Sequence, residues 1–314
     1  MQPKSVSTTI GPLRALGTEW LFEFFDTTVD IPLVTLHIEN SMREFEEHYS
    51  RFLPHSEVSK LNRERILTDS SEEMCALLAL AEKFYRDTDG VFNAGLGSVL
   101  EAHGYDASYS FTSNEQATTT VPLLPFTDCV QITNRTVTLR GIGNLDFGGF
   151  GKGFLIDKLA LSLQKVFNLK YFVINGGGDI FVTSDYGTPI TLYLEHPLEK
   201  NTYLYSIEIQ NAALAASSPF KRRWKDQHNV IHTHLLDGTN AQRLISHAAF
   251  TVADTALMAD TYATVASALG HDEIRCATII GAQSVAYTII DTDSKKILKS
   301  ASFPTLTPLV QEKI

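Results

Sequence analysis

Residues 253–264 have the sequence Ala253-Asp254-Thr255-Ala256-Leu257-Met258-Ala259-Asp260-Thr261-Tyr262-Ala263-Thr264. This stretch is typical of a helix, in which residues four apart lie on the same face. Asp260 and Thr264 are therefore expected to project side by side. Mg²⁺ prefers such hard oxygen ligands and usually completes its coordination shell with water and substrate phosphates. The segment indicates phosphate chemistry, although the same spacing also fits a solvated helix face or a hydroxyl bonded to its own backbone.

The composition around this helix is that of an ordinary globular protein. The chain has 314 residues, of which 44% are hydrophobic and 20% charged, enough for one large domain or two closely packed halves. Its formal net charge of −10 disfavours sequence-independent nucleic-acid binding. Cys75, Cys129 and Cys276 are too scattered for a disulfide framework or a zinc motif. A cytoplasmic protein is expected, because we find no signal peptide, lipidation cysteine or membrane-length apolar run.

Hydrophobic periodicity predicts an α+β fold in which antiparallel hairpins dominate over repeated βαβ units. Capping boxes at Ser41 with Glu44 and at Ser70 with Glu73 mark two helix starts. A polar, threonine-rich stretch at residues 112–125 is expected to be a surface excursion. The predicted helices cover residues 41–52, 70–89, 152–167 and 254–269. The predicted apolar face of the second is Met74, Leu77, Leu78, Ala81 and Phe84, and that of the third is Leu155, Ile156, Leu159, Leu163 and Val166. The predicted strands lie near residues 21–26, 31–38, 130–132, 136–139, 171–175, 180–182, 191–194, 203–209, 277–280 and 285–290, with further short apolar runs at 212–216 and 230–236.

Two glycine clusters flank the predicted helix at 152–167. They are Gly148-Gly149-x-Gly151-x-Gly153 and Gly176-Gly177-Gly178. Glycines let the backbone approach a ligand closely, and the first cluster opens a helix whose N-terminus favours an anion. It is not a phosphate loop, because Lys152 is followed by glycine and not by serine or threonine. Close packing of the helix explains these glycines equally well.

Histidines and basic residues cluster between residues 221 and 234. In a strand, His232 and His234 would face the same side, where they could bind zinc together with an acid. A single histidine could instead act as a general base, or could simply be a partly exposed strand residue. The basic run at residues 221–225 could hold a phosphate, dock an acidic protein segment or form a solvated hairpin tip.

Four segments together resemble the ApbE family of bacterial flavin transferases, the FAD:protein FMN transferases. Weaker similarities at residues 16–20, 56–63, 88–93 and 103–105 extend the resemblance over nearly the whole chain. The four segments are LDFGGFGKG at 145–153 with Asp157, similar to L-D-L-G-G-I-A-K-G-Y-x-x-D; NGGGDI at 175–180, similar to N-x-G-G-D-I; HLLD at 234–237, similar to H-I-I-D-P; and residues 253–264, similar to A-D-T-A-M-x-A-D-A-x-A-T.

The resemblance implies a T-fold-like architecture in which residues 1–314 form a single domain of two packed halves of antiparallel sheet with helices. FAD would bind between the halves as a substrate, with Mg²⁺ on its diphosphate. Asp260, Thr264 and the carbonyl of Gly149 would hold the metal, and His234 matches the histidine that transfer requires. The positions that would contact or border FAD are Leu16, Phe52, His103, Gly104, Tyr105, Asp146, Lys152, Asp179 and Leu236.

The implied reaction transfers FMN from FAD to a serine or threonine hydroxyl of an acceptor redox protein and releases AMP. With water as the nucleophile, the same site would hydrolyse FAD to FMN and AMP. Two other functions fit the residues: a zinc-dependent hydrolase that uses His232 and His234, and a flavin-binding protein without catalysis. The chain departs from the family pattern at His103, Asn93 and Gly238 and at Ser218-Pro219.

Overall fold

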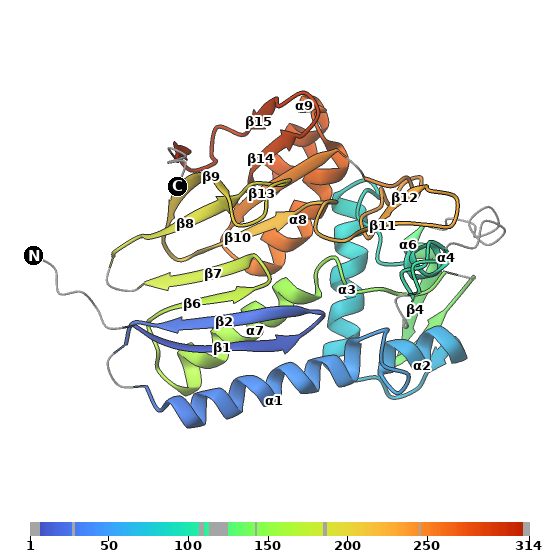
Figure 1. Ribbon diagram of the computed structural model, residues 1–314. Helices are drawn as coiled ribbons and strands as arrows, with labels where there is room; N and C mark the ends of the chain where they lie inside the picture. Colours follow the sequence, from blue (N-terminus) through green and yellow to red (C-terminus); the bar gives the residue numbers. More distant parts are fainter. Residues whose placement is uncertain are drawn as a thin grey trace, which may run out of the picture.

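The fold is built on an eight-stranded sheet in which every neighbouring pair is antiparallel (Figure 1). The computed structural model describes residues 7–26, 29–106, 110–112, 125–141, 143–184, 187–244 and 246–309. Nearly all of the expected surface excursion at residues 112–125 lies outside them. The strands, in sheet order, are β1 (Thr8–Ala15), β2 (Thr18–Phe24), β6 (Tyr171–Gly176), β7 (Asp179–Ser184), β10 (Ala212–Ser217), β13 (His247–Ala253), β14 (Ala286–Asp291) and β15 (Ile297–Lys299).

Two helices, α7 (Gly151–Val166) and α8 (Ala256–Leu269), pack on one face of this sheet. Alternation along β10 shows how the faces differ, since successive side chains in a strand point to opposite sides. Ala213 and Ala215 belong to the core beneath the helices, whereas Leu214 belongs to the core on the other face. The small alanines let α8 approach the sheet closely, as van der Waals packing of a helix on a strand requires.

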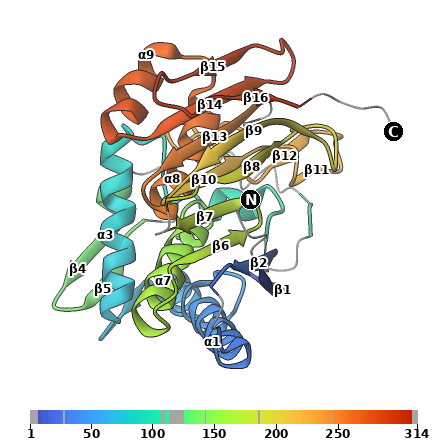
Figure 2. The same ribbon diagram turned by 90° about the vertical axis from the view of Figure 1, so that its left-hand side faces the viewer.

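A small second sheet covers the opposite face (Figure 2). Leu192, Leu194 and Ile207 from this sheet pack against Leu214 and Phe250 of the large one. The two sheets thus enclose an apolar layer of their own, separate from the core beneath α7 and α8. The strands of the small sheet are β8 (Ile190–Glu195), β9 (Tyr203–Ile209) and β16 (Thr307–Pro308).

The remaining elements pack around the large sheet and its two helices (Figure 1). α3 carries the predicted stripe Met74, Leu77, Leu78, Ala81 and Phe84 into the core, and Phe84 contacts Tyr262 of α8. These elements are α1 (Ile31–Tyr49), α2 (Glu57–Glu64), β3 (Ile66–Leu67), α3 (Glu72–Asp87), α4 (Gly97–Ala102), α6 (Phe126–Cys129), β4 (Val130–Thr133), β5 (Thr136–Leu139), β11 (Arg223–Lys225), β12 (Ile231–Thr233), α9 (Glu273–Arg275), the π-helix Cys276–Ile280 and the 3₁₀ turn Gly281–Gln283. No helix among the described residues combines the length and apolar character needed to cross a bilayer.

The predicted strand at residues 31–38 is wrong, because this segment is the first half of α1. Asp30 caps the helix by accepting a hydrogen bond from the Leu33 amide, and Pro32 occupies the first turn, where a missing amide hydrogen costs nothing. Ser41, the predicted N-cap, lies inside the helix and donates its hydroxyl to the carbonyl of His37. The buried positions keep helical spacing throughout: Val34, Ile38, Met42, Phe45 and Tyr49.

Three smaller predictions also need correction. Ser71 caps α3 in place of Ser70, accepting a hydrogen bond from the Met74 amide. Val166, assigned to the apolar face of α7, is 69% exposed at the end of that helix. The run at residues 277–280 belongs to a π-helix, not to a strand, because the chain after Gly270 continues in helical conformation before it enters β14.

Candidate functional site

Segments that are distant in the sequence enclose a cavity of about 510 Å³. The sheet and the helices that pack on it bring them together, so the cavity exists only in the folded chain. Its wall is formed by the β1–β2 turn, the end of α1, the loop before α7, the β6–β7 turn, the end of β10, residues 234–236 and one face of α8.

This cavity collects all of the site residues predicted from the sequence except His103 and Gly104. His103 is buried outside the lining, with its ring centroid 4.9 Å from that of His232. Gly104 forms a tight turn at φ +88°, where a Cβ would lie 2.5 Å from the Thr112 amide nitrogen. The predicted residues that do line the cavity are Leu16, Phe52, Tyr105, Asp146, Gly149, Lys152, Asp179, His234, Leu236, Asp260 and Thr264.

Lys152 lies between two buried carboxylates. Its ammonium group donates to Asp179 and, at 3.1 Å, to Oδ1 of Asp260, while the Gly153 amide donates to Oδ2 of Asp260 at 2.9 Å. Although burial opposes it, the charges of Asp179 and Asp260 raise the pKa of Lys152. Burial and the Asp179 charge raise the pKa of Asp260. When both carboxylates are ionised, they and the one ammonium carry a net charge of −1, so a further cation would be electrostatically favoured here.

Thr264 lies one turn beyond Asp260 on α8 and also faces the cavity. Its hydroxyl makes no hydrogen bond within the described residues, whereas the hydroxyl of Thr261 donates to the Leu257 carbonyl at 2.8 Å. Of the two, Thr261 is therefore the one whose hydroxyl bonds to the backbone of its own helix. Gly149 completes this part of the wall, and a Cβ at this position would lie 3.0 Å from the Phe92 ring. Asp260, Thr264 and Gly149 thus all line the cavity.

Asp157 of α7 fixes where α8 begins. Its two carboxylate oxygens accept hydrogen bonds from the amides of Ala256 and Leu257, at 2.8 and 2.9 Å. The first amides of a helix have no partner within the helix and carry partial positive charge, so this carboxylate satisfies and stabilises them. The contact holds the start of α8 against α7 and thereby positions Asp260 beside Lys152.

The two neighbouring histidines have separate surroundings. His234 lines the cavity, and its Nδ1 lies 3.4 Å from the Arg222 carbonyl, which favours the tautomer that presents an unprotonated Nε2. Burial and the Arg222 charge hold the pKa of His234 below its ordinary value. His232 instead pairs with Asp226, Nε2 to Oδ2 at 2.8 Å, and is absent from the cavity lining. The predicted pairing of both imidazoles at one site is therefore not found among the described residues.

Two arginines complete the site. Arg51, which the sequence did not single out, donates from Nε to Asp146 at 2.5 Å and from Nη2 to the Tyr105 carbonyl at 2.7 Å. Arg222, from the basic run at residues 221–225, donates to the Tyr105 hydroxyl at 2.7 Å. Both line the cavity, so they place positive charge beside its aromatic wall.

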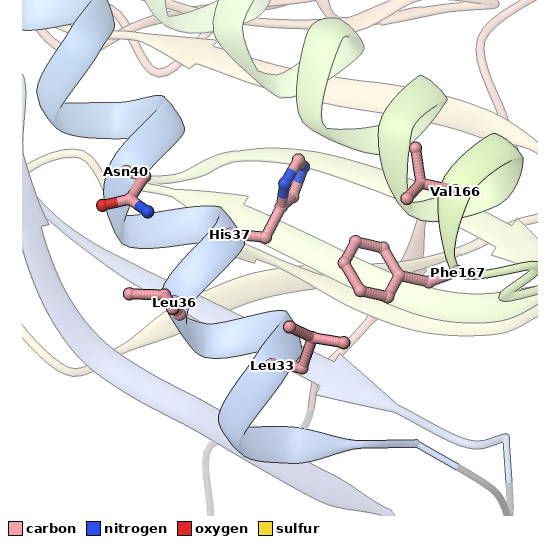
Figure 3. A pocket seen from close by; sticks show the side chains of 6 residues that line it. All are labelled: Leu33, Leu36, His37, Asn40, Val166 and Phe167. Carbon is pink, nitrogen blue, oxygen red and sulfur yellow. The ribbon is translucent and has the colours of Figure 1, made fainter.

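A second hollow, of about 400 Å³, lies between α1 and the end of α7 (Figure 3). His37 points between the two helices, and its Nε2 lies 2.9 Å from the Ser162 hydroxyl. The other lining residues are mainly apolar and include none of the predicted site residues. The full lining is Leu33, Leu36, His37, Asn40, Val166 and Phe167.

A family model described as the ApbE family matches residues 16–282. The chain belongs to the ApbE family. No curated protein matches the chain significantly in sequence.

Solved ApbE structures share the fold at low sequence identity. The ApbE protein of Thermotoga maritima is 19% identical, with a TM-score of 0.83 over 92% of this chain and 96% of that one. The flavin transferase ApbE of Vibrio cholerae is 17% identical, with a TM-score of 0.77 over 95% and 97%. The flavinyl transferase ApbE of Pseudomonas stutzeri is 16% identical, with a TM-score of 0.75 over 96% and 94%. The expected α+β architecture of the ApbE family is confirmed.

Two of this chain's departures from the ApbE motifs contact each other. A Cβ at Gly238 would lie 2.9 Å from Cβ of Asn93 and 2.3 Å from the Gly90 carbonyl oxygen. The Gly238 amide also donates to the Val91 carbonyl at 2.9 Å, a bond that the proline of the family motif could not make. Asn93 in turn accepts from the Gly95 amide at 2.8 Å. Gly238 and Asn93 thus fit one another as a pair, of which Asn93 lines the cavity.

Proposed function

We propose that this chain transfers FMN from FAD to a serine or threonine hydroxyl of a target protein, with Mg²⁺, and releases AMP. Its membership of the ApbE family and the printed names of two structural neighbours, both flavin transferases, support flavin transfer. The observation that carries the proposal is the convergence of oxygen donors, Lys152 and His234 on the wall of one cavity. In this proposal residues 1–314 act as a single domain in the cytoplasm.

We assign the Mg²⁺ to Asp260, Thr264 and the Gly149 carbonyl. The Thr264 hydroxyl, which makes no hydrogen bond to any described residue, and the two carboxylates beside Lys152 support this choice. When bound, the ion would neutralise the diphosphate and the charge that develops on the leaving phosphate.

Lys152 and Arg222 supply the fixed positive charge for the diphosphate. Lys152 is protonated, since its neighbours raise its pKa, and its ammonium is already oriented by Asp179 and Asp260. An oriented cation in a buried site stabilises developing charge without having to reorganise during the reaction. Arg222, held by Tyr105, adds planar donors that suit phosphate oxygens.

His234 is the proposed general base. Its neutral imidazole, oriented through Nδ1, can accept the hydroxyl proton at Nε2 as the hydroxyl oxygen attacks the FMN phosphorus. The new phosphoester bond forms as the bond to the AMP phosphate breaks, and AMP leaves with the electron pair. Water in place of the hydroxyl would give FMN and AMP.

The apolar part of the cavity suits the flavin ring. Phe52 and Tyr105 pack edge to face with centroids 5.7 Å apart, and Tyr105 stacks on Trp224 at 5.7 Å. Leu16 and Leu236 add aliphatic surface. Such a wall favours a planar aromatic ligand, while the charged groups of the cavity suit the diphosphate.

The test is incubation with FAD, Mg²⁺ and candidate acceptor proteins, with AMP release and intact acceptor mass measured together. The proposal predicts a flavin-sized mass increase on an acceptor and an equal amount of AMP. In His234→Ala, both should fall by about two orders of magnitude or more, since general bases contribute that much. His232→Gln is the matched control: an undiminished rate is expected, because this histidine lies outside the cavity lining.

Other outcomes would identify a different function. Flavin binding without AMP release would point to a carrier. Activity that requires zinc and not flavin would point to a hydrolase. Equal transfer by His234→Ala and the parent protein would remove the proposed base.

A further inference from the structure

A second group of metal-binding side chains lies away from the cavity, at the C-terminal end of α8. His247 begins β13, Asp291 ends β14 opposite it in register, and His271 follows Gly270, which ends α8. Within the described residues, these three are the only His, Cys, Asp or Glu triplet whose ligand atoms all lie within 4.8 Å of one another. None of them lines the cavity.

Both imidazoles face the same carboxylate oxygen. Oδ2 of Asp291 lies 3.9 Å from Nε2 of His247 and 3.8 Å from Nδ1 of His271. These separations are too long for direct hydrogen bonds. They are close to those of atoms that share one ion, because ligands about 2.1 Å from a tetrahedral metal lie about 3.4 Å apart. The three side chains are thus arranged around a common point.

Backbone and side-chain contacts orient the two strand ligands. Oδ1 of Asp291 accepts from the amides of Asp293 and Ser294, at 2.8 and 3.0 Å, which leaves Oδ2 for the histidines. Nδ1 of His247 lies 3.3 Å from the Ser246 hydroxyl, so its Nε2 is the nitrogen directed at Asp291. Outer contacts of this kind fix the ring and its tautomer in metal sites.

His271 has fewer hydrogen bonds among the described residues than His247 and Asp291 have. Neither of its nitrogens makes a hydrogen bond among the described residues, and its Nε2 is fully buried. Gly270 brings the loop into place: its φ is +58°, and a Cβ there would lie 2.7 Å from the His247 ring. The C-terminal end of α8, which carries partial negative charge, adds an electrostatic preference for a cation.

We propose that His247, His271 and Asp291 form a metal site for zinc or a similar transition-metal dication, which joins the end of α8 to β13 and β14. Two imidazoles and one carboxylate suit such ions better than Mg²⁺, which favours oxygen ligands. All three side chains are only half-buried, so water can supply the remaining coordination position. Asp260 lies ten residues before Gly270, the C-cap of α8, which corresponds to about 15 Å along the helix axis. The two sites are therefore distinct.

The test uses metal-free full-length protein carrying Asp260→Ala, which removes the other candidate cation site. Zinc is titrated by calorimetry in excess Mg²⁺, and the melting temperature is measured with and without zinc. We expect one equivalent of zinc and a zinc-dependent rise in melting temperature, since an ion that binds only the folded chain stabilises it. Cobalt in place of zinc should give the visible absorption of a low-coordinate site.

His271→Ala and Asp291→Asn, each added to that background, should weaken zinc binding by about tenfold or more and abolish the thermal shift. His48→Ala is the control, because within the described part of the chain His48 pairs with a single carboxylate, that of Glu57 at 2.7 Å. The melting temperature without zinc shows whether each variant is folded. If one variant does not fold, the other still tests the proposal. Unchanged zinc affinity in either folded variant, or no zinc binding by the parent protein, would overturn the proposal.

Discussion

Arg51 is a residue of the site that the sequence around it does not predict. Its partners, Asp146 and the Tyr105 carbonyl, lie 95 and 54 residues away, so no local spacing could have linked them. The metal candidates, by contrast, lie within two short motifs and were predicted from the sequence. Local sequence patterns identify site residues that lie together in one helix or turn. A buried ion pair between distant segments depends on the tertiary fold, so local patterns do not identify it.

Removal of Arg51 should be costly for stability. Arg51→Ala leaves the largely buried Asp146 carboxylate without its cationic partner, and breaking such a pair typically lowers the free energy of unfolding by about 3–5 kcal/mol. Arg14→Ala is the control, because the exposed Arg14–Glu19 pair should contribute about 1 kcal/mol or less. Urea unfolding of the two variants measures both values. A similar, small loss in each would show that the buried pair is not important for stability.

His103 should make the fold sensitive to acid. Burial, then the charges of His232 and Arg243, lower the pKa of His103 to about 4, whereas an ordinary histidine has a pKa of 6.5. Between pH 4 and 6.5 the unfolded chain therefore binds more protons at this position than the folded chain. The free energy of unfolding should fall as the pH drops through this window, by up to about 1.4 kcal/mol per pH unit.

His103→Phe removes the protonation site at this position. It also removes a buried Nδ1 that has no hydrogen-bond partner among the described residues. The variant should lose less stability between pH 6.5 and 4, and it should be about 1 kcal/mol more stable at pH 7. Urea unfolding across this pH range checks both effects, with the exposed His55→Gln as control. An unchanged pH slope in His103→Phe would mean that another group causes the acid sensitivity.

At the scale of elements, α7 and α8 touch at Gly153. A Cβ at this position would lie 2.4 Å from the Ala256 carbonyl oxygen. Gly153→Ala should therefore push the helices apart and lower the free energy of unfolding by about 1–3 kcal/mol. Gly151→Ala in the same helix is the matched control, since its Cβ would have a nearest contact of 3.7 Å. This control should be neutral or slightly stabilising, and thermal melts compare the two.

Equal melting temperatures for the two glycine variants would show that the helices are not in close contact at Gly153. The sequence analysis left open whether these glycines serve a ligand or helix packing. Gly153 serves packing, whereas Gly149 lines the cavity. A glycine-rich motif alone cannot distinguish the two roles, because both require the absence of a Cβ.

The helices α3, α7 and α8 were predicted well, whereas the first half of α1 and the short run at residues 277–280 were not. The α3 stripe and the extent of α8 follow from helical spacing and end signals. Residues 31–38 contain β-branched and leucine side chains, and residues 277–280 contain β-branched ones, and both runs fit a strand as well as a buried helix. In the first case Asp30 and Pro32 marked the helix start, a signal that outweighs strand propensity.

At the scale of the whole molecule, the strand order could not be derived from the sequence. β2 pairs with β6, and β10 lies between β7 and β13, so the sheet is assembled from pairings that cross long stretches of chain. Family resemblance supplied the architecture that local patterns could not. The cavity is a consequence of this topology, since its wall joins the β1–β2 turn to α8, near the other end of the sequence.

The most direct test of the account is the linkage between Mg²⁺ and FAD through Asp260. Dissociation constants for FAD are measured by flavin fluorescence for the parent protein and for Asp260→Ala, each in Mg²⁺ and in EDTA, with the exposed Asp254→Ala as control. The account predicts that the parent and the control bind FAD about tenfold or more tightly in Mg²⁺, a difference of about 1.4 kcal/mol, and that Asp260→Ala loses this difference. An equal loss of affinity by Asp260→Ala in both buffers would contradict it.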